Sequence, residues 1–221
     1  MHINLLITFD LDFTLINNKH GILNSFQYAF AKYQIPLIKE EILEKTIGTP
    51  LEEVFKTKTN INPFKLVKAF REFYGQKGIY QVKLYDGVIE KLKAFKKAQI
   101  KLGVVTSKKR EMAIKLLKYL NIFHYFDFVI GETDIIKKKT DIQVKQFFYN
   151  QFHHYKYLIV GDHLTDRYLA EMLECPFIGL LTGYSTEKEL KTNARVPVLV
   201  LNNISELNVK TILNLLDLYE A

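Results

Sequence analysis

The chain has 221 residues, 48% hydrophobic and 25% charged, which suits a soluble α/β domain with a smaller insertion. No apolar run approaches the roughly 20 residues needed to span a bilayer, and the N-terminal apolar run is too short for a signal peptide, so we expect a cytoplasmic protein without a membrane partner. The formal net charge of +7 comes from lysines spread along amphipathic segments with no zinc-finger or RNA-binding signature, which favours small anionic substrates over nucleic acid.

The first predicted element is a buried strand that is followed at once by two acids. Residues 3–9 form a short, branched apolar run, typical of a strand buried on both faces of a parallel sheet. Asp10 and Asp12 come next, where open α/β sheets bind ligands. One carboxylate can act as a nucleophile while the other transfers a proton, and together they can hold a hard cation. Taken alone, the two acids fit a strand-ending turn equally well.

A run of helices without intervening strands follows. Apolar spacing and helix-stop residues predict four helices, over residues 22–33, 40–46, 51–56 and 63–74. Gly48 is expected to end the second helix and Gly75 the fourth, whose apolar side includes Phe64. Because this run breaks the strand–helix alternation, we interpret residues 19–83 as a small all-helical cap domain inserted after the first strand.

From Tyr85 onward strands and helices alternate. The expected strands cover residues 101–105, 126–130, 157–160, 177–181 and 196–201. The helices between and after them are expected at residues 88–95, 110–119, 141–152, 165–173 and 204–219. Helical connections between strands imply right-handed crossovers and a mostly parallel sheet. We therefore predict a Rossmann-like three-layer α/β core made of residues 1–18 and 84–221.

Two of the later strands also end in polar residues. Thr106 and Ser107 follow the strand ending at Val105, and hydroxyls and free amides just ahead of a helix suit a phosphate group, although they are also ordinary helix caps. Asp162 follows the strand over residues 157–160 and would complete an oxygen-rich site of the kind that Mg²⁺ prefers. Asp166 lies where it can cap the next helix.

In this order the segments resemble the motifs of the haloacid dehalogenase superfamily of phosphohydrolases. The segments at residues 10–15, 104–108 and 161–166 resemble its first, second and fourth motifs. The superfamily also keeps a lysine before the helix that precedes the fourth motif; Lys139 is the best match and Lys138 the fallback, because Thr140 stands where many relatives have proline. The helical insertion resembles that of phosphoglycolate-phosphatase-like and pyrophosphatase-like members.

The resemblance implies a Mg²⁺-dependent phosphatase that works through an aspartyl phosphate. Asp10 would attack phosphorus, and Asp12 would protonate the leaving oxygen and then activate water. Lys139 would neutralise the nucleophile and the phosphate, while Thr106 and Ser107 would bind the phosphate. Phe13 replaces the glycine usual in the first motif, and its ring is expected to narrow the entrance beside the nucleophile.

The same resemblance implies the metal site. Asp10, Asp12 and Asp162 would hold Mg²⁺, and Asp166 would orient Lys139 or a metal-bound water. The substrate would be a small phosphate monoester, such as a phosphoglycolate-like compound, a nucleotide, a sugar phosphate or pyrophosphate. The physiological substrate stays open, as does the choice between a monomer and a homodimer.

Three alternatives remain at this stage. A β-phosphoglucomutase-like phosphoryl transferase is weakened because Ile22 stands where those relatives carry a cap histidine. A non-catalytic phospho-ligand-binding protein on the same fold predicts the loss of an acid, whereas Asp10, Asp12 and Asp162 are all present. A nucleic-acid-binding protein, supported only by net charge, predicts association that weakens steeply with salt. The single cysteine, Cys175, precludes an internal disulfide and fits a reducing compartment.

Overall fold

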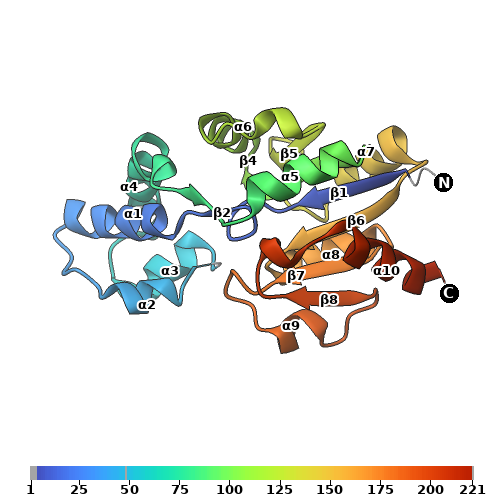
Figure 1. The fold of residues 1–221 in the computed structure, drawn as a ribbon. Coiled ribbons are helices and arrows are strands. Elements are labelled where there is room, and N and C mark those ends of the chain that lie inside the picture. The colour runs from blue at the N-terminus through green and yellow to red at the C-terminus, as the bar shows by residue number, and fades with distance from the viewer. Residues whose placement is uncertain (1–3, 48, 221) are drawn as a thin grey trace. The chain divides into compact units, whose positions relative to one another are not determined.

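The computed structural model, which describes residues 4–47 and 49–220, divides into two compact units, Met1–Ile16 with Leu84–Ala221, and Asn17–Lys83 (Figure 1). The first unit contains a six-stranded sheet in the order β5-β4-β1-β6-β7-β8, and all its pairings are parallel. The strands are β1 Leu5–Phe9, β4 Lys101–Lys109, β5 Phe128–Glu132, β6 Lys156–Gly161, β7 Phe177–Leu180 and β8 Val198–Leu201. The predicted strand start at Ile3 lies outside the described residues.

Helices cover both faces of this sheet. They are α5 Val88–Lys97, α6 Arg110–Tyr119, α7 Ile142–Phe152, α8 Leu164–Met172, α9 Glu187–Lys191 and α10 Val209–Glu220. Leu6 of β1 packs in one apolar cluster with Phe148 of α7 and Leu169 of α8. Phe9, which points to the opposite face because side chains alternate along a strand, stacks on Phe95 of α5 with ring centroids 6.3 Å apart. The predicted α/β three-layer core is confirmed.

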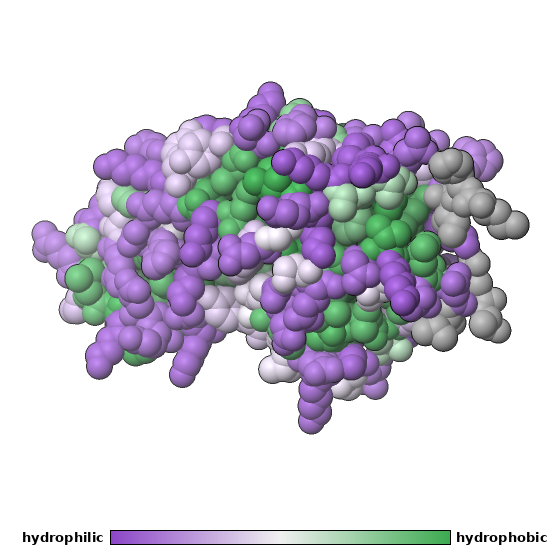
Figure 2. All heavy atoms as spheres, viewed as in Figure 1, coloured by the Kyte–Doolittle hydropathy of each residue, from purple (hydrophilic) through white to green (hydrophobic). Residues whose placement is uncertain are grey.

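Strand β1 is buried by its neighbouring strands and by the helices on both faces of the sheet. All five residues of β1 are buried, as expected for a central parallel strand with helices on both sides. In the view of Figure 2, hydrophilic residues dominate the outer surface of this unit, with apolar residues showing between them. Within the described ranges no helix is both long and apolar enough to cross a membrane.

The second unit is the helical insertion after β1. It consists of α1 Lys19–Lys32, α2 Glu40–Glu44, α3 Leu51–Lys58, α4 Pro63–Gln76 and the 3₁₀ turn η1 Gly78–Tyr80. Phe26 packs against Phe55 and Phe70 with ring centroids 5.4 and 4.9 Å apart, and all three rings are buried in a core of the insertion's own. The short strands β2 Ile16–Asn17 and β3 Lys83–Leu84 pair where the chain leaves and rejoins the sheet unit.

Several predicted boundaries were wrong. Phe64 is 65% exposed because it lies in the first turn of α4, away from the buried stripe. Gly75 and Gly78 were expected to stop the fourth helix; α4 continues past Gly75 to Gln76 and ends before Gly78. The last helix begins at Val209, since a separate 3₁₀ turn, η3 Ile204–Glu206, is capped by Asn203. The helix α9 was not predicted, and Gly48 lies outside the described residues.

Candidate active site

Asp10 and Asp12 lie at the carboxyl end of β1, a central strand of the sheet. β1 has a parallel neighbour on each side, and the main-chain amide of Asp10 donates to the carbonyl of Val160 at 2.9 Å, so Asp10 continues the strand. Its side chain is buried, with the residue 7% exposed. The chain then turns tightly, the amide of Ile16 donating to the carbonyl of Leu11 at 3.1 Å. Asp12 therefore lies in a loop at the carboxyl end of β1.

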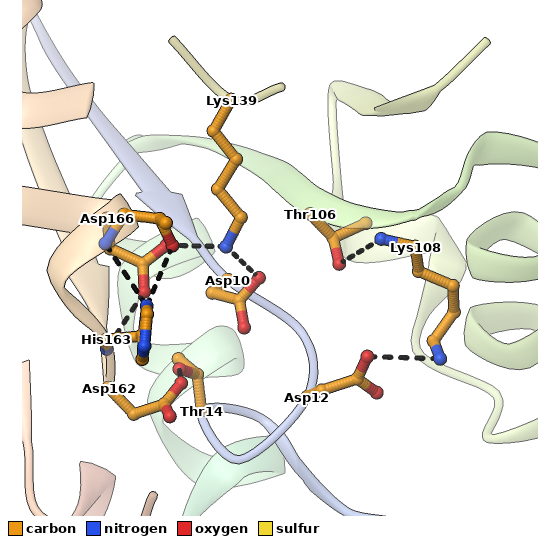
Figure 3. Close-up of polar contacts among 10 residues, drawn as sticks. Asp10, Asp12, Thr14, Thr106, Lys108, Lys139, Asp162, His163 and Asp166 are labelled. Carbon is orange, nitrogen blue, oxygen red and sulfur yellow. Dashed lines mark hydrogen bonds and ion pairs between the residues drawn. The ribbon is translucent and has the colours of Figure 1, made fainter. Parts of the chain in front are cut away.

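Lys139 joins the acids from a different segment. Its ammonium donates to Asp10 Oδ1 at 2.5 Å and to Asp166 Oδ1 at 2.6 Å (Figure 3). The side chain is 5% exposed, whereas Lys138 is exposed and its main-chain amide donates to Asp141 at 2.9 Å. Of the two lysines considered from sequence, Lys139 is the one that reaches the acids.

The remaining acids come from β6 and α8. Asp162 directly follows β6, and the Thr14 hydroxyl donates to its Oδ1 at 3.1 Å. Asp166 lies in the first turn of α8, where its Oδ2 accepts from the amide of His163 at 3.1 Å. Asp166 thus caps the helix with one oxygen and binds Lys139 with the other, and its supporting role in the reaction stays a prediction. The carboxylates of Asp10, Asp162 and Asp166 offer ligand atoms within 4.8 Å of one another.

Burial governs the protonation of this cluster. Desolvation raises the pKa of Asp10 to about 7, with Lys139 opposing the rise and the neighbouring acids adding to it. Desolvation and the nearby Asp10 and Asp166 also raise the pKa of Asp162. For Lys139, burial disfavours the ammonium, but the attraction of Asp10 and Asp166 outweighs burial and raises its pKa. Asp10 and Asp162 therefore resist ionisation even with the Lys139 ammonium close by.

This cluster fits a small divalent cation. Its donors are hard carboxylate oxygens, which are the ligands that Mg²⁺ takes. Two glycines make room for the acids: a Cβ on Gly183 would collide with Asp162 Oδ2, and one on Gly161 would collide with the Asp166 carboxyl group. The absence of a Cβ at these two positions leaves the space that the two carboxylates occupy. Asp12, proposed from sequence as a further ligand, is not one of these three residues, and its carboxylate contacts Lys108 instead.

The second predicted motif has a different backbone from the one expected. β4 runs on through Lys109 with a register shift after Val105, so Thr106 and Ser107 are extended and precede α6 by several residues. The expectation that Thr106 and Ser107 lie directly at a helix N-terminus was therefore wrong, and their binding of phosphate stays a prediction. Thr106 is buried and its hydroxyl accepts from the amide of Lys108 at 3.2 Å, while Ser107 is exposed.

Lys108 is a site residue that the sequence interpretation missed. Its ammonium lies 3.0 Å from Asp12 Oδ2, and its side chain is 10% exposed (Figure 3). The adjacent Lys109 and Arg110 are exposed. Because residues two apart on an extended chain point the same way, Lys108 shares a side with Thr106. The apolar run ends at Val105, so nothing in the sequence signals that the strand continues through Lys109 and separates Lys108 from the rest of the basic run.

Phe13 adopts a backbone conformation that favours glycine, with φ of 60°. Its carbonyl accepts from the Thr182 hydroxyl at 2.5 Å, which helps to fix the turn. The ring meets Tyr184 edge-on, with centroids 5.3 Å apart, and the residue is 8% exposed. The ring is thus packed against another part of the same unit.

Residues 7–180, more than half of the chain, match the family model described as haloacid dehalogenase-like hydrolase. The chain belongs to the haloacid dehalogenase-like hydrolase family. The matched segment runs from β1 to β7 and contains Asp10, Lys139 and Asp166. The resemblance predicted from the motifs is confirmed.

Relatives of this hydrolase are named as pyrophosphatases or as phosphoglycolate phosphatases. This chain is 33% identical to the pyrophosphatase PpaX of Halalkalibacterium halodurans over 135 residues. The aligned residues cover 61% of this chain and 62% of that protein. This chain is 24% identical over 209 residues to a phosphoglycolate phosphatase of Thiobacillus denitrificans, with coverage of 87% and 91%. A solved haloacid dehalogenase-like hydrolase from Streptococcus pneumoniae has a TM-score of 0.79 at 26% identity, with coverage of 90% and 95%. The match to PpaX thus spans less than two thirds of that protein's length.

Proposed function

We propose that this hydrolase is a Mg²⁺-dependent phosphatase that cleaves a small phosphate monoester through an aspartyl phosphate. The observation that carries the proposal is Lys139, whose ammonium bridges Asp10 and Asp166 at 2.5 and 2.6 Å. A buried carboxylate, a fixed cation and an oxygen-rich cluster meet at the carboxyl end of a parallel sheet. Phosphoryl transfer depends on such positioning and charge neutralisation. Relatives named as phosphatases and pyrophosphatases support the same class.

In the proposed reaction Asp10 attacks phosphorus, and the bond from phosphorus to the leaving oxygen breaks. Asp12 gives that oxygen a proton. Asp12 then takes a proton from water as the water attacks phosphorus, so that the Asp10–phosphorus bond breaks and orthophosphate is released. Lys139 holds Asp10 in place and offsets negative charge during both steps, and Thr106 binds a phosphoryl oxygen, with Ser107 in a supporting role.

We propose that Asp10 and Asp162 hold Mg²⁺, which would neutralise charge on the phosphoryl oxygens. Asp166 would support the site through Lys139. The proposal that Asp12 is a third ligand stays a prediction. Its carboxylate is ion-paired with Lys108.

We also propose that residues 19–83 serve as the cap that governs substrate choice and that residues 1–18 and 84–221 form the catalytic core. The candidates for the leaving group are glycolate-like acids, nucleosides, sugars and a second phosphate. A cytoplasmic location fits the lone buried Cys175, because a thiol stays reduced there. The protein would act as a monomer or a homodimer.

The test is phosphate release from phosphoglycolate, pyrophosphate, nucleotides, sugar phosphates and an aryl phosphate, each with and without Mg²⁺. The account expects Mg²⁺-dependent turnover by the wild type and none by Asp10→Asn, which keeps the side-chain shape and removes the nucleophilic charge. Circular dichroism of the variant checks that it is folded. Equal activity of the two proteins would overturn the assignment of Asp10.

A further inference from the structure

The geometry points to a second anion-binding position in the site: we infer that Lys108 selects substrates whose leaving group carries a negative charge next to the scissile oxygen. This inference rests on the proposed phosphatase function and narrows its substrate class. The class includes phosphorylated hydroxy acids, with a carboxylate on the carbon that bears the ester oxygen, and pyrophosphate, with a second phosphate. Neutral alcohols and nucleosides fall outside it.

The two site lysines are placed at different acids. Lys139 enters from the segment before α7 and binds Asp10 and Asp166, whereas Lys108 lies on β4 and contacts Asp12 Oδ2 at 3.0 Å (Figure 3). The main-chain amide of Lys108 is tied to the Thr106 hydroxyl at 3.2 Å. Lys108 is therefore held beside the proposed acid–base residue, and Lys139 beside the nucleophile.

This division of positions has a chemical consequence. Asp12 must reach the oxygen that leaves with the alcohol or phosphate, so a cation in contact with its carboxylate lies beside the leaving group. An ammonium carries three N–H donors and can bind a second anion while it keeps Asp12. Bonds of this kind between ionised groups are stronger than those between neutral groups. A carboxylate or phosphate adjoining the scissile oxygen is the group within reach.

The burial of Lys108 separates this role from that of an ordinary surface charge. Its side chain is 10% exposed, but the side chain of Asp12 is 27% exposed and Lys109 and Arg110 lie in solvent. Removing an ammonium from water costs free energy, and anions close to it offset that cost. A partly buried lysine next to a more exposed acid is suited to gain from a further anion.

The test compares matched substrates. Ethyl phosphate has a methyl group where phosphoglycolate has its carboxylate. We expect Lys108→Met to lower kcat/KM for phosphoglycolate by about 100-fold, mainly by raising KM. For ethyl phosphate we expect a loss of only about fivefold, because ethyl phosphate has no carboxylate that could form an ionic bond with Lys108. Lys108→Arg should keep part of the preference. Lys109→Met, which removes the same charge from the next, exposed residue, should change the ratio by less than about twofold.

A binding measurement makes the test independent of turnover. In the Asp10→Asn background with Mg²⁺, the Kd of uncleaved phosphoglycolate should be about tenfold or more below that of ethyl phosphate, and adding Lys108→Met should remove the difference. If Lys108→Met instead lowers kcat equally for both substrates, Lys108 only positions Asp12 and the inference fails. If the wild type cleaves nothing, including an aryl phosphate, the proposed function fails. The binding preference then decides the inference separately.

Discussion

Lys139 sets the charge balance at the nucleophile. Its ammonium lies between two buried carboxylates, and burial would otherwise favour the neutral acids. Even with Lys139 present, the pKa of Asp10 is raised to about 7. The protein therefore stores unfavourable electrostatic energy at Asp10 that a bound cation would relieve.

The pH dependence of stability should reveal this stored energy. The folded-state pKa of Asp10, about 7, lies above its ordinary value of 3.8, so the folded state keeps a proton that the unfolded chain loses, and stability falls as the pH rises through this window. In metal-free protein Asp10→Asn cannot ionise. Relative to the wild type, it should gain about 4 kcal/mol of unfolding free energy between pH 4 and pH 8. Denaturant titrations at both pH values measure the change, and a difference that does not vary with pH would contradict the account.

Removing Lys139 should destabilise the protein, whereas Asp10→Asn should stabilise it at high pH. Lys139→Met leaves two buried carboxylates without their shared cation and should lower the unfolding free energy by about 3–5 kcal/mol at pH 8. The loss should shrink at pH 5, where the acids are more protonated, and phosphatase activity should disappear. Lys138→Met removes a neighbouring exposed lysine and is the matched control, expected to change stability by less than about 0.5 kcal/mol. Thermal melts of both variants at both pH values provide the comparison.

At the scale of elements, the sheet order assembles the site. β1 lies between β4 and β6, so the residues at and just after the carboxyl ends of these three strands meet at one edge of the sheet. Asp10 comes from the middle strand, Thr106 and Lys108 from one neighbour, and Asp162 from the other. The helix α8 then adds Asp166 from its first turn.

The loop after β7 should control the metal site through Gly183. Its hydrogen faces Asp162 Oδ2, and a Cβ there would collide with that oxygen. Gly183→Ala should therefore displace Asp162 and weaken Mg²⁺ binding by about tenfold or more. Thr186→Ala in the same loop removes a bond from the Thr186 hydroxyl to Glu189 and is the control. Calorimetric titration with Mg²⁺ distinguishes them; equal affinity of the two variants would show that Asp162 does not bind the metal.

Much of this arrangement was predictable from sequence. Asp10, Thr106 and Asp162 each follow an apolar run, and parallel strands bring such ends together. The contact between Lys108 and Asp12 was not predictable, because it depends on β4 extending four residues past the apolar run. The five-residue helix α9 is too short to show periodicity, and Phe64 follows the apolar spacing although the first turn of α4 leaves it in solvent.

At the scale of the whole molecule, the chain places a separately packed helical unit in the connection between β1 and α5. The insertion has its own apolar core, centred on Phe26, Phe55 and Phe70, and the sheet unit has another, which includes Phe148 and Phe177. Each unit therefore buries its own apolar surface. The site residues Asp10, Lys139 and Asp162 all belong to the sheet unit, and so does Lys108. The proposed chemistry and the proposed preference for an anionic leaving group therefore reside in this unit, whereas the proposed cap is the other unit.

The most direct test of the central claim is to trap the covalent intermediate. The protein is mixed with a rapidly cleaved substrate and Mg²⁺, quenched in acid within one turnover, digested and examined by mass spectrometry. The account predicts that the peptide containing Asp10 gains the mass of one phosphoryl group, and that the same peptide from Asp10→Asn does not. A phosphoryl group on another residue would contradict it, as would rapid turnover with Asp10 unmodified at every quench time.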